Sequence, residues 1–521
     1  MKNLNDIENT PIDNLEQSEQ SFSEYDAASY SADTPADAWY HYTDEDYEDE
    51  GYEGDYEYDY EYDDYGDTYY DEEIPPEVPE KKKRKGLKIF ANVLLGICTF
   101  LAAFYLTVLY CPAQPIRNLR NMYIQAAMST LSHKWLATSI IPGEMIDEVV
   151  RAQYESEAAL VGVNSNWGTI DVQAVPTFAN DTITSEEAAA AQQAAEAARL
   201  EGEASAANET PVDSGLLEGD DSLGPEFESS EQATFFSMFY ELDYDSMMDY
   251  VDAHPEVLNN GWSGIDINEA GLDDNGTDIY TTEGEQVLAI NAEEGIIIFR
   301  VYCNNSRGLM AVLKDTSRLS LKPASTLGVI GQTAGNICEA NNGILAINGS
   351  AFMDDGSGNG GQIAGLAVCD GKFYGSKLYS NYKRIELRKD GKMYVVDSSA
   401  LIYDDTLQAC EFKPALIVDG EITVDENCGW TAPAPRTVIG QSSRLETMMV
   451  VIEGRFLDSP GCSVVDIAEL MHKHGCVQAM NLDGGTSSMM YYDGEYLNRC
   501  SNTALSGGRP LPTAWVYTKA S

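Results

Sequence analysis

One short stretch near the C-terminus gathers several residue types that can do chemistry. It reads NLDGGTSS at residues 481–488, so the carboxylate of Asp483 precedes two glycines and three hydroxyl side chains. The glycines let the backbone approach a ligand closely, and the hydroxyls can donate hydrogen bonds to it. A hairpin turn is the simpler alternative. The candidates for substrate binding in this stretch are Asn481, Gly484, Gly485, Thr486, Ser487 and Ser488.

A second polar stretch lies at residues 346–361, which read AINGSAFMDDGSGNGG. Asn348 and Gly349 end a strand-like run there, and a glycine-rich loop containing Asp354 and Asp355 follows. Such a loop can present N–H groups to an anion or oxygens to a hard cation. The acidic spacing does not fit an EF-hand loop, so a divalent cation near these two aspartates stays an alternative to a plain surface loop.

Two arginines stand beside strand-like runs in the same part of the chain. Arg436 lies in PRTVIGQ at residues 435–441, and Arg509 lies in GGRPLPTAWVY at residues 507–517. An arginine at a strand end can hold a phosphate through two hydrogen bonds, although an ion pair at the surface is the alternative. Together with Asp483, these groups have the chemistry of a sugar phosphate site. The arginines would neutralise the phosphate, and the carboxylate would serve the sugar carbon or a water.

The composition and the absence of known motifs argue against several other functions. The chain of 521 residues has ten cysteines, five histidines and a formal net charge of -54, which argues against nucleic acid as a partner. The cysteines form no CxxC pair, and no Cys/His cluster has the spacing of a zinc site. The sequence signatures of serine hydrolases, zinc proteases and nucleotide-binding loops are absent, so we expect no metal or other cofactor.

The elements that must position these residues begin at about residue 285. From 285 to 521, short runs rich in β-forming residues alternate with Gly, Asn and Asp, which predicts an α+β domain with a mixed β-sheet and few helices. One helix is clear from its ends. Ser463 and Asp466 can form a capping box before an apolar stretch, and Gly475 ends that stretch.

The N-terminal half of the chain is organised differently. Residues 1–80 hold 28 acidic residues and one lysine, and we expect a disordered, tyrosine-rich tail there. The basic run KKKRK is followed by about 22 uncharged apolar residues, so 81–111 is predicted to be a transmembrane signal anchor with the tail in the cytoplasm. The next boundaries are membrane-proximal helices at 112–160, an acidic Ala-rich spacer at 161–235 and a lead-in segment at 236–284.

The C-terminal motifs together resemble the phosphodiester glycosidase domain family. The resemblance covers about residues 285–519 and rests on four stretches in a fixed order, LAINGSAFMDDGSGNGGQIAGLAVCDGKFY, PRTVIGQ, VIEGRFLDSPGCSVVDIAELMHKHGCVQAMNLDGGTSSMMYYDGEYLN and GGRPLPTAWVY. Two departures concern small residues. Ser350 and Ala351 precede Phe352 where the family often has Asn-Gly-Gly-Phe, and Thr486 stands where it often has glycine or serine. These departures bear on the substrate more than on the activity.

The resemblance implies hydrolysis of a glycosyl phosphodiester between the sugar and the phosphate oxygen. It makes Asp483 the essential carboxylate, as nucleophile or as general base. The catalytic residues would be Asp483, Arg436 and Asn348, with Arg436 and Arg509 stabilising the phosphate charge. Asn348 and the backbone amides of Gly484 and Gly485 would orient the substrate, and Gly349 is a further candidate for substrate binding. The membrane anchor also looks like that of bacterial members that carry this domain outside the cell. We therefore expect a single-pass cell-membrane protein whose extracellular catalytic domain acts on surface glycans or exopolysaccharide.

Two other functions stay open at this point. A non-catalytic envelope scaffold or glycan-binding protein with a vestigial site would fit the long spacer, and a signalling adaptor rests only on the tyrosine-rich tail.

The pairing of the cysteines is also open, because the nine cysteines from Cys111 onward would lie outside the cell. An odd number leaves at least one unpaired if the others form disulfides, and the sequence assigns no pairing. Cys462 and Cys476 flank the predicted helix and should be too far apart to pair directly.

Overall fold

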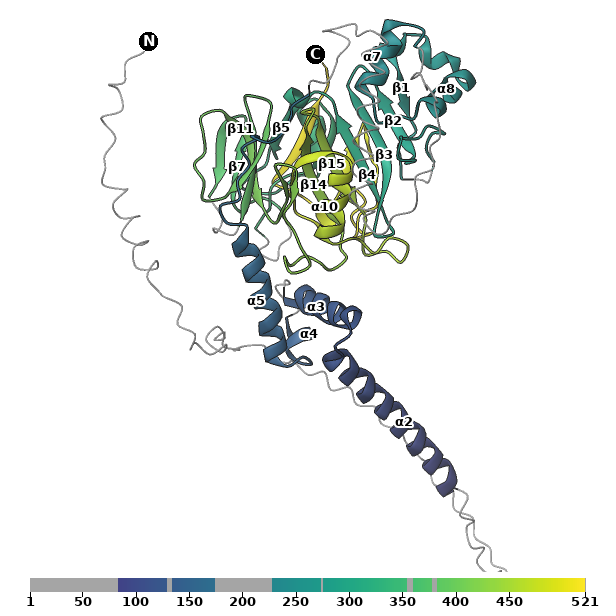
Figure 1. Ribbon diagram of the computed structural model, residues 1–521, viewed down its shortest axis with the longest axis vertical. Helices are drawn as coiled ribbons and strands as arrows, with labels where there is room; N and C mark the ends of the chain where they lie inside the picture. The colour runs from purple at the N-terminus through teal and green to yellow at the C-terminus, as the bar shows by residue number, and fades with distance from the viewer. Residues whose placement is uncertain are drawn as a thin grey trace, which may run out of the picture. The chain divides into compact units, whose positions relative to one another are not determined.

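A computed structural model of the chain describes residues 83–128, 134–173, 227–272, 275–353, 359–376 and 382–520. These residues combine α-helices with antiparallel β-sheets, which confirms the expected α+β class (Figure 1). The predicted acidic tail, most of the predicted Ala-rich spacer and the pair Asp354 and Asp355 lie outside the described residues.

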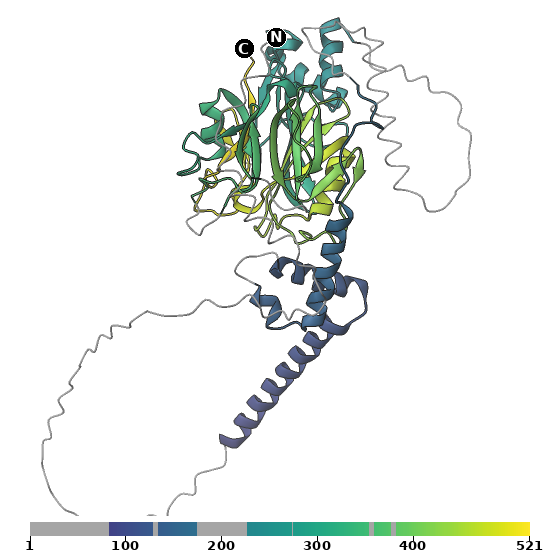
Figure 2. The same cartoon turned by 90° about the vertical axis from the view of Figure 1, so that its left-hand side faces the viewer.

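Helix α2, Lys83–Tyr110, comes first along the described chain (Figure 2). Its part Lys88–Tyr110, 23 residues, is the one helix in the described ranges that is long and apolar enough to cross a membrane by length and composition. At about 1.5 Å per residue, such a helix exceeds the roughly 30 Å of a bilayer core. Its large apolar side chains are exposed, as Phe100 shows with 69%. The helix is consistent with single-pass anchoring, and its orientation stays a prediction.

Three helices follow in the region expected to be membrane-proximal. They are α3 (Gln114–Met128), α4 (Trp135–Thr138) and α5 (Gly143–Ala159). They share a small apolar cluster, which includes Ile124 and Ile146 and also Leu109 at the end of α2.

The largest sheet has nine strands in the order β1-β2-β3-β4-β15-β14-β16-β12-β13, all paired antiparallel. Its central strands β14 and β15 are buried along their whole length, because both faces of the sheet are covered. Strands covered on both faces read as near-continuous apolar runs, as β15 does, whereas β14 also carries buried polar side chains such as Thr437 and Gln441. The strands are β1 (Asp266–Asn268), β2 (Val287–Asn291), β3 (Ile296–Cys303), β4 (Ser306–Leu313), β12 (Ala415–Val418), β13 (Glu421–Ile422), β14 (Arg436–Ser442), β15 (Thr447–Ile452) and β16 (Cys476–Asn481).

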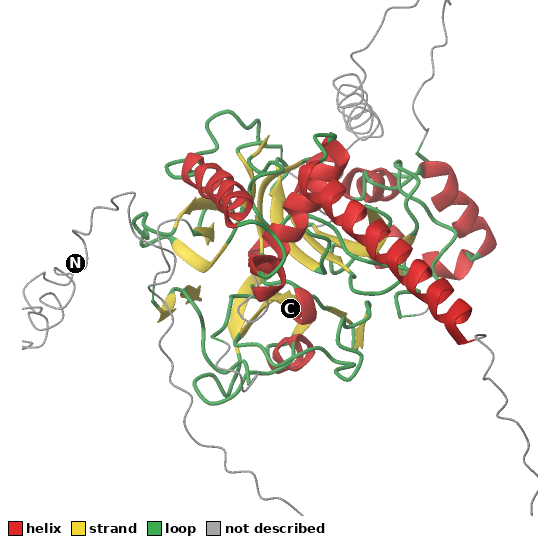
Figure 3. Cartoon of the chain, turned by 90° about the horizontal axis from the view of Figure 1, so that it is seen from below, coloured by secondary structure: helices red, strands yellow, loops and turns green. Residues whose placement is uncertain are grey.

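Two further sheets have five strands each, in the orders β10-β9-β11-β7-β8 and β18-β17-β6-β19-β5. The first contains β7 (Leu366–Cys369), β8 (Lys372–Gly375), β9 (Lys383–Arg388), β10 (Met393–Asp397) and β11 (Thr406–Phe412). The second contains β5 (Leu319–Pro323), β6 (Gly343–Asn348), β17 (Met490–Tyr492), β18 (Glu495–Tyr496) and β19 (Thr513–Thr518). Figure 3 shows in green the loops that join these strands, and the polar motifs lie in such loops.

The nine-stranded sheet contributes to two apolar clusters. One cluster contains residues of α7 (Ser230–Met238), α8 (Tyr244–Ala253) and α10 (Val464–Lys473), so these helices pack on that sheet. The other cluster joins the sheet to both five-stranded sheets. Helix α9 (Ala334–Ala340) packs on β6, β17 and β19. The described residues also contain four 3-10 helices, η2 (Pro255–Leu258), η3 (Trp262–Gly264), η4 (Thr316–Arg318) and η5 (Gly485–Ser487).

The predicted capping box at the start of α10 is confirmed. Ser463 Oγ accepts a hydrogen bond from the main-chain N–H of Asp466, and the Asp466 carboxylate accepts one from the N–H of Ser463. Gly475 follows the helix with a φ of 75°, a left-handed conformation that glycine adopts without strain. The chain then turns directly into β16, the strand that leads to Asp483.

Candidate active site

The loop that carries Asp483 lies where β14 begins and β16 ends. The two strands are antiparallel neighbours, with Val438 opposite Asn481. Past the end of β16, the main-chain N–H of Gly485 still donates to the carbonyl of Pro435 at 3.1 Å. Gly485 has a φ of 63° and starts η5, so the chain bends sharply just after Asp483. The glycine pair thus permits the turn that sequence reasoning expected at the strand end.

Asn348 connects this loop to a second sheet. It ends β6 and is fully buried, and its Nδ2 donates to the main-chain oxygen of Asp483 at 2.7 Å. Its Oδ1 accepts from Thr437 Oγ1 in β14 at 2.8 Å. Both ends of the amide are therefore used, and a buried amide that lost either partner would keep an unsatisfied group. The structure brings together Asn348 and Asp483, two of the three predicted catalytic residues.

The carboxylate of Asp483 is held by its own loop. Ser487 Oγ donates to Asp483 Oδ2 at 2.6 Å, and Asp483 is only half-buried. Ser488 is buried, and its Oγ has no hydrogen-bond partner among the described residues. Thr486 Oγ1 lies 3.5 Å from Ser501 Oγ. The loop therefore presents a fixed carboxylate together with the hydroxyls that the sequence predicted.

Two predicted binding residues have contacts that support the fold. A Cβ at Gly349 would lie 2.4 Å from Thr513 Oγ1, so only glycine fits against β19 at this position. Asn481 is buried, and its Nδ2 donates to the main-chain oxygen of Lys413 at 2.9 Å. Their roles toward a substrate stay predictions.

Arg436 lies on the other side of β14 from Asn348. Side chains alternate across a strand, and the next residue, Thr437, points its hydroxyl at Asn348. The Arg436 side chain is buried, and its Nε donates to the carbonyl of Cys462 at 3.0 Å. Its Nη2 donates to the carbonyls of Trp430 and Ala432 at 2.6 and 2.9 Å.

This environment differs from the one expected for a phosphate ligand. Burial lowers the pKa of Arg436, and the guanidinium contacts carbonyls of the loop before β14. The hydrogen bonds of Arg436 hold that loop, and they give no support to the predicted contact with a phosphate. Arg509 is placed differently, because its guanidinium stacks on the ring of Phe352, 4.0 Å from the centroid. Phe352 follows the Asn348 motif, so Arg509 lies against the other predicted substrate loop.

Sequence reasoning missed a third arginine, Arg455. A Cβ at Gly485 would stand 3.2 Å from Arg455 Nη2, so this guanidinium lies directly against the loop that follows Asp483. Arg455 is exposed and has a φ of 67°, which is uncommon for a residue with a side chain and often marks a functional loop. The signal was the pair Gly454-Arg455 at the end of the apolar run of β15, the same pattern that singled out the other loops.

A buried acid anchors the loop of Arg455. Glu453 accepts from the main-chain N–H of Arg499 at 2.7 Å, and its other oxygen accepts from the Arg499 guanidinium at 2.6 Å. Arg307, at the start of β4, reaches the same carboxylate at 3.4 Å. These contacts tie the loop after β15 to the start of β4 and to the segment of Arg499.

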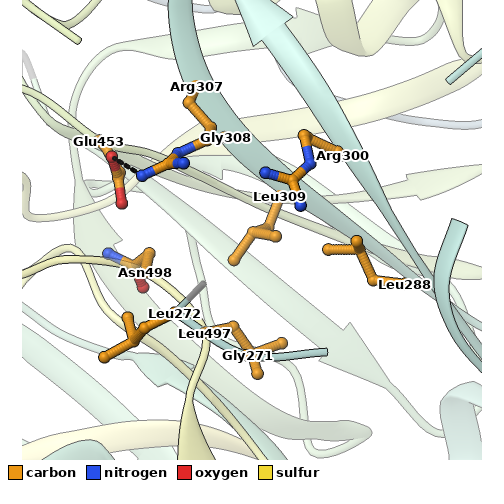
Figure 4. Close-up of a pocket in the computed structure, with 10 residues that line it drawn as sticks. All are labelled: Gly271, Leu272, Leu288, Arg300, Arg307, Gly308, Leu309, Glu453, Leu497 and Asn498. Atoms are coloured by element: carbon orange, nitrogen blue, oxygen red, sulfur yellow. Dashed lines mark hydrogen bonds and ion pairs between the residues drawn. The ribbon is translucent and has the colours of Figure 1, made fainter. Parts of the chain in front are cut away.

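Figure 4 shows a small pocket beside this anchor, with the ion pair of Arg307 and Glu453 among its lining residues. One wall is Asn498, whose Nδ2 donates to the carbonyl of Ser488 at 2.9 Å. The pocket therefore adjoins the loop of Asp483. It is lined by Gly271, Leu272, Leu288, Arg300, Arg307, Gly308, Leu309, Glu453, Leu497 and Asn498.

Metal-ligating residues do not gather in the part of the chain that the structure describes. Within these ranges, no group of three or more His, Cys, Asp or Glu side chains could hold a metal ion. The candidate cation ligands Asp354 and Asp355 are outside these ranges, so the metal requirement stays untested.

Comparison with known proteins finds a match to one family model. Residues 341–518 match the family model described as phosphodiester glycosidase. The chain is also 29% identical over 182 residues to an uncharacterized SPbeta prophage-derived protein, YomE, of Bacillus subtilis strain 168. That match covers 33% of this chain and 28% of the relative, so the chain spans less than a third of the relative's length.

Solved structures are similar at low identity. The catalytic domain of zebrafish N-acetylglucosamine-1-phosphodiester alpha-N-acetylglucosaminidase, auto-inhibited by its pro-peptide, is 17% identical with a TM-score of 0.36. That match covers 43% of this chain and 82% of the zebrafish chain. A hypothetical protein from Synechocystis is 14% identical with a TM-score of 0.34, over 44% of this chain and 63% of that one. The sequence match at 341–518, which includes every candidate site residue, identifies this part of the chain as a domain of the phosphodiester glycosidase family.

Proposed function

We propose that the chain is a hydrolase that cleaves the bond between sugar and phosphate in glycosyl phosphodiesters. The observation that carries this proposal is the half-buried carboxylate of Asp483, fixed by Ser487, in a loop that the guanidinium of Arg455 contacts at Gly485, within the residues that match the phosphodiester glycosidase family. A carboxylate next to a cation is the combination that such a reaction needs. One group serves the anomeric carbon, and the other stabilises the departing phosphate.

Asp483 has two possible roles in this reaction. As a nucleophile, it attacks the anomeric carbon and forms a glycosyl ester that water then hydrolyses. As a general base, it takes a proton from a water that attacks the same carbon. In both cases the electron pair of the broken bond leaves with the phosphate oxygen, and the product is a phosphate monoester. Arg455, and Arg509 from the opposite loop, would stabilise the negative charge of that leaving group.

The proposed substrate is a surface glycan or exopolysaccharide that contains sugar-1-phosphodiester links. Helix α2 supports a membrane anchor, and the basic run before it favours a cytoplasmic N-terminus with the domain outside. An extracytoplasmic domain on a membrane anchor meets polymers of the envelope. The single-pass location in the cell membrane and this substrate class belong to the same proposal.

The test uses full-length protein in detergent and a panel of sugar-1-phosphodiesters, with release of reducing sugar as the readout. Asp483→Asn should lower the rate by at least about 100-fold. Asp493→Asn is the matched control, because Asp493 is an exposed aspartate in the turn between β17 and β18 of the same segment. Full activity of the Asp483→Asn variant would remove this carboxylate from the mechanism. Tight binding of envelope polymer without any release of sugar would favour the scaffold function instead.

A further inference from the structure

Two cysteines far apart in the sequence lie in the apolar cluster between the nine-stranded sheet and its helices. Cys303 ends β3 and Cys462 precedes α10, and both side chains are buried, with 3% and 0% exposed. The neighbouring Cys462 side chain raises the pKa of the Cys303 thiol, in agreement with this placement.

The surrounding backbone holds the two thiols together independently. Ser306, the β4 partner of Cys303 in the hairpin, accepts from the N–H of Gly461 at 2.7 Å and donates to its carbonyl at 2.9 Å. Cys462 itself pairs with Ala434, with its N–H donating at 3.1 Å. The segment before α10 is thus held against the β3–β4 hairpin at Gly461 and against Ala434 at Cys462.

We propose that Cys303 and Cys462 form a disulfide bond. The two segments already lie side by side, because Ser306, opposite Cys303, is hydrogen-bonded to Gly461, which directly precedes Cys462. The bond would join the β3–β4 hairpin to residues 453–462, the loop that carries Arg455. This inference is independent of the proposed hydrolase activity.

The oxidant would be a disulfide, either a small molecule such as oxidised glutathione or a protein of that chemical class. One cysteine thiolate attacks a sulfur of the oxidant and releases one thiol. The second thiolate then attacks the resulting mixed disulfide and releases the other thiol. Two protein thiols lose two electrons and two protons, and one oxidant disulfide becomes two thiols.

The folded protein protects this bond and also hinders its late formation. The neighbouring Cys462 side chain, together with burial, raises the pKa of the Cys303 thiol far above its ordinary value. Since the thiolate is the attacking species, exchange should occur during folding, before the two side chains are buried. Once formed, the bond should resist reductants until the protein unfolds.

Competing pairs fit less well. Cys369 and Cys410 lie on neighbouring strands, but Cys410 is opposite Ala367, so the two cysteines are diagonal neighbours. Diagonal Cβ atoms are typically about 7 Å apart, which exceeds the roughly 4 Å that a disulfide needs. Cys476 follows α10, and its thiol donates to the carbonyls of Gln441 and Gln478.

The experiment refolds full-length protein in detergent with oxidised and reduced glutathione, blocks free thiols with N-ethylmaleimide, and maps tryptic peptides by mass spectrometry. Cys303 falls in residues 301–307 and Cys462 in residues 456–473. The two peptides should appear as one linked species that is lost after reduction. Two separately alkylated peptides would overturn the proposal. So would a link from residues 456–473 to residues 393–436, which hold Cys410 and Cys428.

A stability measurement gives a second readout. Reductant added in denaturant before refolding should lower the Tm of the wild type by about 5–10 °C, because the bond closes a long loop of the unfolded chain. Cys303→Ala should show no such dependence on reductant. Cys338→Ala is the matched control, since Cys338 is equally buried but belongs to the cluster around α9. Cys338→Ala should keep the full decrease in Tm caused by reductant. An equal loss of this decrease in both variants would contradict the assigned pair.

Discussion

Asn348 Nδ2 donates to the main-chain oxygen of Asp483 at 2.7 Å, and this hydrogen bond joins two different sheets. Asn348 ends β6, while Asp483 follows β16 of the nine-stranded sheet. The other end of the amide accepts from Thr437, so the side chain can adopt one orientation only. Because Asn348 is fully buried, water cannot replace either bond. The amide therefore sets the position of the candidate catalytic carboxylate relative to the second sheet.

Asn348→Asp should impair both folding stability and activity. The new carboxylate keeps the acceptor for Thr437, but it places an oxygen against the oxygen of Asp483. We expect a loss of about 2–4 kcal/mol in stability and at least about 10-fold in sugar release. Thermal unfolding and the phosphodiester assay measure the two effects. Asn336→Asp, an exposed position on α9, is the control, and unchanged values for both variants would contradict this role of Asn348.

Arg455→Gln should lower activity with little effect on stability. The side chain is exposed, and its guanidinium lies against Gly485 in the site loop. Removing one charged group that stabilises a leaving phosphate is expected to reduce kcat/KM by about 100-fold. The change in stability should stay within about 0.5 kcal/mol, as for other surface positions. Steady-state kinetics on a sugar-1-phosphodiester would contradict the proposed role if kcat/KM stayed within twofold.

Arg436→Gln should show the opposite pattern. Its guanidinium donates to the carbonyls of Cys462, Trp430 and Ala432, and the substitution leaves several of these buried acceptors unsatisfied. We expect a loss of about 2–4 kcal/mol in stability. Thermal unfolding measures it, and the activity of the remaining folded protein should fall less than in Arg455→Gln. A stable variant with abolished activity would restore the original prediction that Arg436 binds phosphate.

The contrast between the two arginines marks the limit of sequence reasoning for this chain. Local patterns predict that β6 ends at Asn348, that β16 ends near Asp483 and that α10 starts at Ser463, because each depends on neighbours a few residues away. The face to which Arg436 points depends instead on the pairing of β14 with β16. A pattern within β14 alone does not contain that information.

Contacts between residues that are far apart along the chain could likewise not be predicted from the sequence. Asn348 and Asp483 are 135 residues apart, and nothing local indicates that the amide of one meets the carbonyl of the other. Glu453 and Arg499 meet across 46 residues, and their pairing explains why a glutamate follows the apolar run of β15. The polar motifs lie beside strand ends, but their mutual contacts come from the order of strands in the sheets.

A buried ion cluster predicts how stability depends on pH. Lys314 Nζ lies 2.8 Å from Glu446 and 2.6 Å from Glu241, and all three side chains are largely buried. Burial alone would raise the pKa of Glu446, but Lys314, Arg444 and the hydrogen bond from Ser442 lower it below the ordinary value of 4.5. The folded state thus binds the Glu446 proton more weakly than the unfolded state. The stability from this group is present above about pH 4.5 and is lost as pH falls through the lowered pKa.

The difference in stability between the wild type and Glu446→Gln should therefore become smaller in acid. At pH 7 the variant loses the ion pair and should be less stable by about 3–5 kcal/mol, because Lys314 stays buried without this partner. The gap should shrink as pH falls below about 4.5, since the wild type then protonates Glu446. Burial raises the pKa of Glu241, which acts with the opposite sign, but Glu241 titrates in both proteins. Thermal unfolding between pH 7 and pH 3, with Glu421→Gln as an exposed control, measures the gap, and a constant gap would show that Glu446 is not the titrating group.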